Sequence, residues 1–173
     1  MSHTTPTRPS ARANISAGLL VFRRINELEV LLGHPGGPFW MKKDDGAWSI
    51  PKGQVERAVE RGLERDDLLA TARREFTEET NLTVKFAGLD ACMALAPVKQ
   101  RSGKIVHAFA IEADLDLSPF ASNTFDIEWP PKSGRHQSFP EIDRVAYFAL
   151  PVAIEKIIPY QRPFLIELGK RLR

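Results

Sequence analysis

The sequence predicts an α/β fold, a sandwich in which helices pack against a mixed sheet. Three features of the 173 residues predict it. Short β-prone runs follow one another with hairpin-like connections, one long segment near the middle has helical periodicity, and two shorter helical segments close the chain. A helix set among many strands is typical of layered α/β domains.

The first third of the chain reads as strands and loops. Residues 16–24 and 29–33 are apolar and β-prone, and a short polar turn separates them, so they predict a hairpin. Residues 34–45 are rich in Gly and Pro and predict a loop. Residues 47–50 predict a short strand that stops at Pro51.

The long helical segment spans residues 65–80. Leu69, Ala72 and Phe76 recur at three- and four-residue spacing and form one apolar stripe. Two aspartates near its start suit the helix dipole. Asn81 follows the helix, and Asn tolerates the left-handed conformation that often ends one. We therefore expect a helix of about four turns that stops at Asn81.

Further strands and helices are expected along the second half. The strands are predicted at residues 84–86, 88–97, 105–113, 124–129 and 146–149, and the helices at 151–157 and 162–172.

Composition bounds the class of protein. With 43% hydrophobic and 27% charged residues, the chain is an ordinary globular one, which excludes collagen, coiled coil and disorder throughout. The formal net charge of +2 gives no reason to expect nucleic-acid binding. We expect a disordered tail over residues 1–14, which are rich in Ser, Thr, Pro and Arg, and one domain over residues 15–173.

Cysteine content and hydropathy bear on the compartment. Cys92 is the one cysteine, so no disulfide can form within the chain, and a reducing, cytoplasmic location is expected. Cys92 lies in an apolar run and is expected to be a small buried side chain. No apolar stretch approaches the ~20 residues needed to span a bilayer, so no membrane partner is expected.

The helix at residues 65–80 has an acidic side. At about 100° per residue, Glu75, Glu78 and Glu79 fall within an arc of about 100°. Like charges at this spacing repel, and a hard divalent cation would offset the repulsion. A solvated acidic face with ordinary ion pairs is the alternative. Just upstream, residues 48–53 (Trp-Ser-Ile-Pro-Lys-Gly) end in a glycine turn that permits close approach of a ligand, which favours a metal and phosphate site.

Residues 53–82 resemble the Nudix box of the MutT-like Nudix hydrolases. That signature runs Gly, five residues, Glu, seven residues, then Arg-Glu-apolar-any-Glu-Glu-any-Gly-apolar. The second half is matched by Arg74, Glu75, Phe76, Glu78, Glu79 and Leu82. The resemblance implies a Nudix-type α/β/α sandwich with a catalytic helix. It also implies attack of water on a phosphorus of a nucleoside diphosphate linked to another group.

The chain departs from this pattern in two places. Gly53 and Arg74 lie 21 positions apart, seven more than in the signature, so an insertion is expected within residues 56–64. The Glu slot of the signature then falls on Asp66 or on Val59, depending on the direction of counting. The final Gly is replaced by Asn81, which can adopt the required backbone conformation.

The resemblance also implies roles for the site residues. Glu75, Glu78 and Glu79, with the carbonyl of Gly53, are the implied ligands of Mg²⁺ or Mn²⁺. Arg74 is expected to orient Glu75. A further acidic ligand or base is expected before the last strand, and Glu141 is the candidate there, a loop acid being the equal alternative.

Phosphate binding needs fixed cations. Lys52, next to Gly53, is the first candidate, followed by Lys43 and Arg135, although each alone is more often a solvated charge. Other cations that could reach the site are Lys42, Lys104 and His136, and the aromatic residues that could stack on a base or pack in the core are Phe39, Trp40, Trp129 and Phe139. His34 is not expected to be a ligand.

The expected substrate is a small nucleotide. The Gly-Pro-Phe-Trp loop and residues 122–131 resemble a bacterial subgroup of predicted nucleotide pyrophosphohydrolases. Dinucleoside polyphosphates are the first expectation and nucleoside triphosphates the second. The rival hypothesis is a Nudix module that senses a nucleotide without cutting it, which the altered box would favour. A third, an α/β domain whose helix is merely acidic, requires the whole box to be coincidence.

Overall fold

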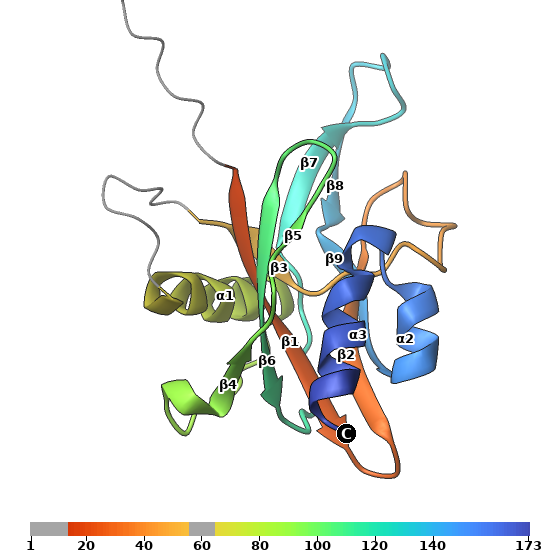
Figure 1. Cartoon of the computed structure of the whole chain (residues 1–173). Helices are drawn as coiled ribbons and strands as arrows, with labels where there is room; N and C mark the ends of the chain where they lie inside the picture. The colour runs from red at the N-terminus through yellow and green to blue at the C-terminus, as the bar shows by residue number, and fades with distance from the viewer. Residues whose placement is uncertain (1–13, 56–64) are drawn as a thin grey trace, which may run out of the picture.

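The computed structural model describes residues 14–55 and 65–173, so the expected insertion and nearly all of the expected tail lie outside the described residues. A seven-stranded sheet forms the centre, with strand order β4-β6-β1-β2-β9, while β3 pairs with β1 and β5 with β6. A two-stranded hairpin, β7-β8, projects from this body (Figure 1). The strands are β1 Ile15–Arg24, β2 Leu28–Pro35, β3 Lys52–Gln54, β4 Cys92–Ala94, β5 Val98–Lys99, β6 Ile105–Glu112, β7 Thr124–Glu128, β8 His136–Pro140 and β9 Ile142–Ala149, and the helices are α1 Arg65–Thr80, α2 Leu150–Lys156 and α3 Arg162–Arg171.

The strand β1 lies inside the sheet and is buried on both faces. It pairs antiparallel with β2 and β3 and parallel with β6, which makes the sheet mixed. Because side chains alternate along a strand, Leu19 faces the side covered by α1, and Leu20 faces the side covered by α2 and α3. Two cores therefore sandwich the sheet, and the predicted α/β/α architecture is confirmed (Figure 1).

The helix α1 has the predicted bounds and packs as its pattern indicates. Leu69, Ala72 and Phe76 are all almost completely buried against β1. None of the described helices is long and apolar enough to cross a membrane. Cys92 is buried at the start of β4, as a small apolar side chain would be.

Several strand predictions are wrong. Residues 47–50 form no strand, because Trp48 and Ser49 each make only an isolated bridge and are held by packing; the pairing with β1 begins after Pro51, in β3. Residues 84–86 form no strand, and the predicted strand 88–97 shortens to β4 behind a 3-10 turn, η1 Leu89–Ala91. The strand β8 was not predicted, because its first three residues are polar and exposed.

Asn81 ends α1 in the left-handed conformation, with φ of 57°, as its sequence position predicts. Its amide nitrogen also donates a hydrogen bond to the carbonyl of Pro119 at 3.0 Å. The final position of the signature thus has the backbone conformation that a Gly would adopt there.

This conformation gives a first testable prediction. Asn81→Gly loses one exposed hydrogen bond and keeps the backbone, so we expect the free energy of unfolding to fall by about 1 kcal/mol or less. Asn81→Val should destabilise the fold clearly more, because a β-branched residue is strained at positive φ. Thermal unfolding of the two variants measures the difference, and equal melting temperatures would contradict it.

Candidate active site

The N-terminal end of β3 and the acidic side of α1 meet at the edge of the sheet. The backbone N–H of Lys52 donates a hydrogen bond to Oε2 of Glu79 at 3.1 Å. This contact joins the two parts of the signature that lie on either side of residues 56–64, and it places Glu79 in a largely buried position.

Gly53 leaves room for the carboxylate of Glu75. A Cβ built at Gly53 would overlap that carboxylate, so no other residue fits here without moving Glu75. The close approach brings the Glu75 side chain, of which 15% is exposed, against the β3 backbone. The glycine of the signature is therefore required by the helix that packs on it.

Arg74 bridges two of the glutamates. Its Nη1 lies 3.1 Å from Oε1 of Glu75 and 3.3 Å from Oε2 of Glu78. Glu75 is held between this guanidinium and the β3 backbone, and the orienting role of Arg74 stays a prediction. Glu78 lies further out, with 47% of its side chain exposed.

Glu79 carries the largest electrostatic perturbation in the site. Burial, the neighbouring charge of Glu75 and, less strongly, that of Glu141 raise the pKa of Glu79 to about 8, against the hydrogen bond from Lys52. The pKa of Glu75 is also raised, mainly by burial and further by the charges of Glu78 and Glu141. Glu141 comes from the junction of β8 and β9, so the fold brings this candidate to the helix.

Glu79 and Glu141 line a pocket of about 230 Å³. Its charged lining residues are Lys52, Glu79 and Glu141, and its other lining residues are Gly33, Pro35, Ser49, Ile50 and Ile142. Burial lowers the pKa of the Lys52 amine, while the charge of Glu79 opposes that shift. The pocket therefore presents both a cation for phosphate and carboxylates for a metal or a proton.

Lys104 is the cation that sequence reasoning left among several. It lies just before β6, and its pKa is lowered by burial and by the charge of Lys52, while the charge of Glu79 raises it. Lys104 therefore lies within electrostatic range of both Lys52 and Glu79, and Lys52 is itself affected by the charge of Glu79. The sequence signal was weak, because a lysine in the β5-β6 turn looks like any solvated charge.

Two other predicted cations lie elsewhere. Lys43 places its Nζ 4.8 Å from the ring centre of Trp40, on the exposed loop between β2 and β3, and does not line the pocket. Arg135 lies in the turn that joins β7 to β8, where its carbonyl accepts the backbone N–H of Trp129 at 2.8 Å. Neither of them lines the pocket, so a phosphate contact there has no support in the geometry.

The backbone around Glu141 is fixed from two sides. Gly36 N–H donates to the carbonyl of Glu141 at 2.9 Å, and Glu141 N–H donates to the carbonyl of Asn123 at 2.8 Å. His34, fully buried beside them, lies 2.8 Å from Oδ1 of Asp143 and 2.6 Å from the carbonyl oxygen of Lys43. His34 thus ties loop and strand together, in keeping with the expectation that it is not a ligand.

The donor set fits a hard divalent cation in its chemistry. Glu75, Glu79 and Glu141 offer only oxygen atoms, and burial together with neighbouring like charges raises the pKa of Glu75 and of Glu79. Among the residues that the structure describes, no three His, Cys, Asp or Glu side chains are already gathered closely enough to hold a metal. Binding a cation would therefore require these flexible side chains to turn toward each other.

The raised pKa of Glu79 predicts how stability depends on pH in the presence of chelator. The folded protein keeps the proton of Glu79 up to pH about 8, whereas the unfolded chain releases it near 4.5. The folded state therefore binds more protons between these values, and stability should fall as pH rises through them. Denaturant unfolding from pH 5 to pH 9 measures the slope, and Glu79→Gln should make it shallower. An unchanged slope in that variant would refute the assignment.

Comparison with known proteins decides the family. The family model described as the NUDIX domain matches residues 13–165. The chain belongs to the Nudix family. No significant match was found among curated proteins. The predicted family, the α/β/α fold class and the assignment to the Nudix hydrolases are thereby confirmed.

Solved structures share the fold at low sequence identity. The Nudix domain of Shewanella oneidensis NrtR, complexed with ADP ribose, is 16% identical with a TM-score of 0.59, covering 98% of this Nudix chain and 94% of that one. An Ap4A hydrolase of C. elegans, in a binary complex, is 19% identical with a TM-score of 0.57, covering 92% and 97%. A MutT protein from Methanosarcina mazei is 16% identical with a TM-score of 0.53, covering 96% and 99%. At these identities the likeness is one of fold.

Proposed function

We propose that this Nudix protein hydrolyses a pyrophosphate linkage in a nucleoside diphosphate-linked substrate, with Mg²⁺ or Mn²⁺ as cofactor. The observation that carries the proposal is a pocket lined by Glu79, Glu141 and Lys52, with the charge of Glu75 acting on Glu79 beside it. Anionic phosphates need the amine, whereas the carboxylates need a cation or a proton.

Each side chain has a task that its surroundings suit. Lys52 and Lys104 attract and place the phosphate oxygens. Arg74 holds Glu75 against the β3 backbone, and Glu78 and the carbonyl of Gly53 complete the proposed ligand set with Glu75 and Glu79. A bound divalent cation would polarise a phosphoryl oxygen and lower the pKa of a bound water.

Proton transfer is assigned to the acids of the pocket. Glu79 Oε2 accepts the Lys52 N–H, which fixes the direction of its carboxylate. A carboxylate whose pKa lies near neutrality accepts a proton from water efficiently, so Glu79 is the first candidate for the base, and Glu141, which lines the same pocket, is the second. Burial of Glu79 shields this step from bulk water.

The proposed substrates are dinucleoside polyphosphates first and nucleoside triphosphates second. One protein of similar fold is an Ap4A hydrolase, and another binds ADP ribose, so all three nucleotide classes belong in the test. The hypothesis of a non-catalytic sensor is favoured by two departures from the signature, the expected insertion and Asn81. Asn81 no longer favours it, because this residue has the backbone conformation that a Gly would adopt.

The test is a substrate panel with metal control. We expect hydrolysis of at least one of diadenosine tetraphosphate, ATP, 8-oxo-dGTP and ADP-ribose with Mg²⁺ or Mn²⁺, giving phosphate, pyrophosphate or nucleotide products. Chelator should abolish it, and added metal should restore it. Full turnover in chelator would refute the metal dependence. Binding without turnover of any panel member would leave the sensor hypothesis in its place.

A further inference from the structure

Phe39 is a large apolar side chain in an exposed position that the proposed catalytic machinery does not use. It is 57% exposed, on the loop between β2 and β3. Its neighbour Trp40 packs on the core, with the Nζ of Lys43 4.8 Å from its ring centre, whereas Phe39 and Met41 on either side of it are exposed. An aromatic ring left in water is costly unless something covers it.

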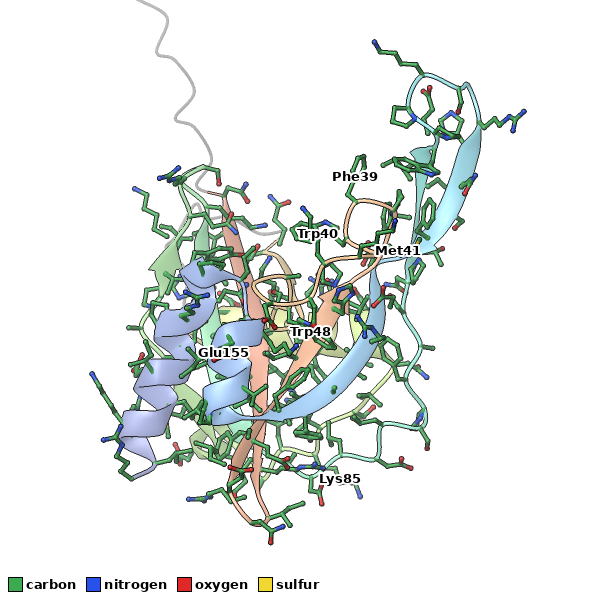
Figure 2. The ribbon with its side chains drawn as sticks, turned by 90° about the vertical axis from the view of Figure 1, so that its right-hand side faces the viewer. Phe39, Trp40, Met41, Trp48, Lys85 and Glu155 are labelled. Carbon is green, nitrogen blue, oxygen red and sulfur yellow. The ribbon has the colours of Figure 1, made fainter. Side chains whose placement is uncertain are left out.

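The ring of Phe39 is positioned by a second aromatic residue. Phe39 and Trp129 lie edge to face, with ring centres 5.3 Å apart and planes at 80°. Trp129 follows β7 on the projecting hairpin, so the pair joins two segments far apart in the sequence. Figure 2 shows Phe39 rising from its loop beside that hairpin, with Met41 further along the same loop.

The loop and the hairpin are joined again closer to the pocket. Gly37 has φ of 97°, and a Cβ there would lie 2.8 Å from the ring of Phe125, so the β7 face packs directly on the loop backbone. Gly36 donates to the carbonyl of Glu141, and Glu141 donates to that of Asn123. The two segments that carry the aromatic pair therefore converge on Glu141, an acid of the pocket.

The distance between the pair and the pocket is bounded by the chain. Pro35 lines the pocket and Phe39 follows it by four residues, so their Cα atoms are at most about 14 Å apart. That span is comparable with the length of an extended nucleoside polyphosphate. One end of the site offers cations for phosphate, and the other offers flat aromatic surface.

We propose that Phe39 and Trp129 form the nucleobase-stacking subsite of this enzyme, so that its substrates are selected for an aromatic base as well as for a pyrophosphate. This inference rests on the proposed function in that the phosphates are placed at Lys52 and Lys104. Every nucleobase has a π face, so stacking does not depend on which base is present. Stacking on an aromatic side chain contributes ~1–3 kcal/mol to nucleic-acid binding.

The test separates base binding from phosphate binding. The probes are α,β-methylene-ADP, which carries a base and resists hydrolysis, and inorganic tripolyphosphate, which has no base. With Mg²⁺ present, Phe39→Ala and Trp129→Ala should weaken binding of the nucleotide about 5- to 150-fold in titration calorimetry. Binding of tripolyphosphate by these two variants should stay unchanged. The variant Phe39→Tyr, which keeps an aromatic ring, should bind the nucleotide as the wild type does. Met41→Ala, at an equally exposed position of the same loop, is the matched control.

Several results would overturn the inference. These are an unchanged nucleotide Kd in Phe39→Ala, an equal loss for both probes, or wild-type protein that binds the nucleotide no more tightly than tripolyphosphate. A change in oligomeric state on Phe39→Ala, measured by sedimentation, would instead assign the pair to an interface between two copies. If nucleotide binding depends on Phe39 but no member of the substrate panel is hydrolysed, only the proposed function is refuted. If a panel member is hydrolysed equally well by wild type and Phe39→Ala, only this inference is refuted.

Discussion

Glu79→Gln is expected to lower turnover by a factor on the order of 10²–10⁴ while the fold persists. The substitution keeps the shape and an oxygen that can accept the Lys52 N–H, but removes the negative charge and the basic site. In chelator at pH 9 the variant should also melt at a higher temperature than the wild type, because a buried carboxylate repelled by Glu75 becomes a neutral amide.

Glu155→Gln is the matched control for this variant. Glu155 is an exposed glutamate on α2, separated from the pocket, and Figure 2 labels it on that helix. The control should keep wild-type turnover and melting temperature. A loss of less than threefold in Glu79→Gln would show that the carboxylate neither binds the metal nor takes the proton.

Gly53→Ala is expected to lower kcat/KM by on the order of 10²-fold with little change in melting temperature. The new Cβ meets the end of the flexible Glu75 side chain, which can swing away and leave the fold intact. Displacing a ligand by about 1 Å is enough to cost two orders of magnitude in rate. Steady-state kinetics with Mg²⁺, together with thermal unfolding, checks both parts.

The neighbouring strand supplies the contrasting variant. Gly18 pairs with Lys52 across the β1-β3 ladder, and a Cβ there would lie 2.6 Å from the carbonyl oxygen of Pro51. Backbone cannot swing aside, so Gly18→Ala should lower the melting temperature as well as the activity. If Gly53→Ala destabilises as much as Gly18→Ala does, its loss of activity would report unfolding rather than displacement of Glu75.

The sequence predicted those parts that depend on local pattern. The apolar stripe of α1 and the helix end at Asn81 follow from residues that are close together in the sequence. The placement of Glu75 and Glu79 on one side of the helix follows from the same helical periodicity. The strand β8 escaped prediction because its stability comes from pairing with β7 and from packing of Pro140 on the loop at Gly36, which no alternation of its own polar residues reveals.

Tertiary placement decided the remaining site residues. Glu141 lines the pocket, and Lys104 comes within range of the charges of Lys52 and Glu79, because β9 and β6 belong to the same sheet as β3, a relation that spacing along the chain does not contain. For the same reason Arg135, a lower-ranked candidate than Lys52, lies in a hairpin turn and does not line the pocket. The sequence ranked Lys52 first because it adjoins Gly53, but it could not rank Lys104 above Lys43 and Arg135.

The parallel pairing of β1 with β6 has a consequence for how the protein is made. Ile15 pairs with Ile105, so about half of the chain must be synthesised before β1 can pair with β6. During synthesis on the ribosome, β1 and β2 can form a hairpin early. The edge of β1 that pairs with β6 in the finished sheet stays unpaired until β6 has been made. Pairings at such sequence separation fold slowly and leave apolar strand edges exposed to association. Nascent chains that end before β6 should therefore be the species that chaperones hold and that aggregate without them.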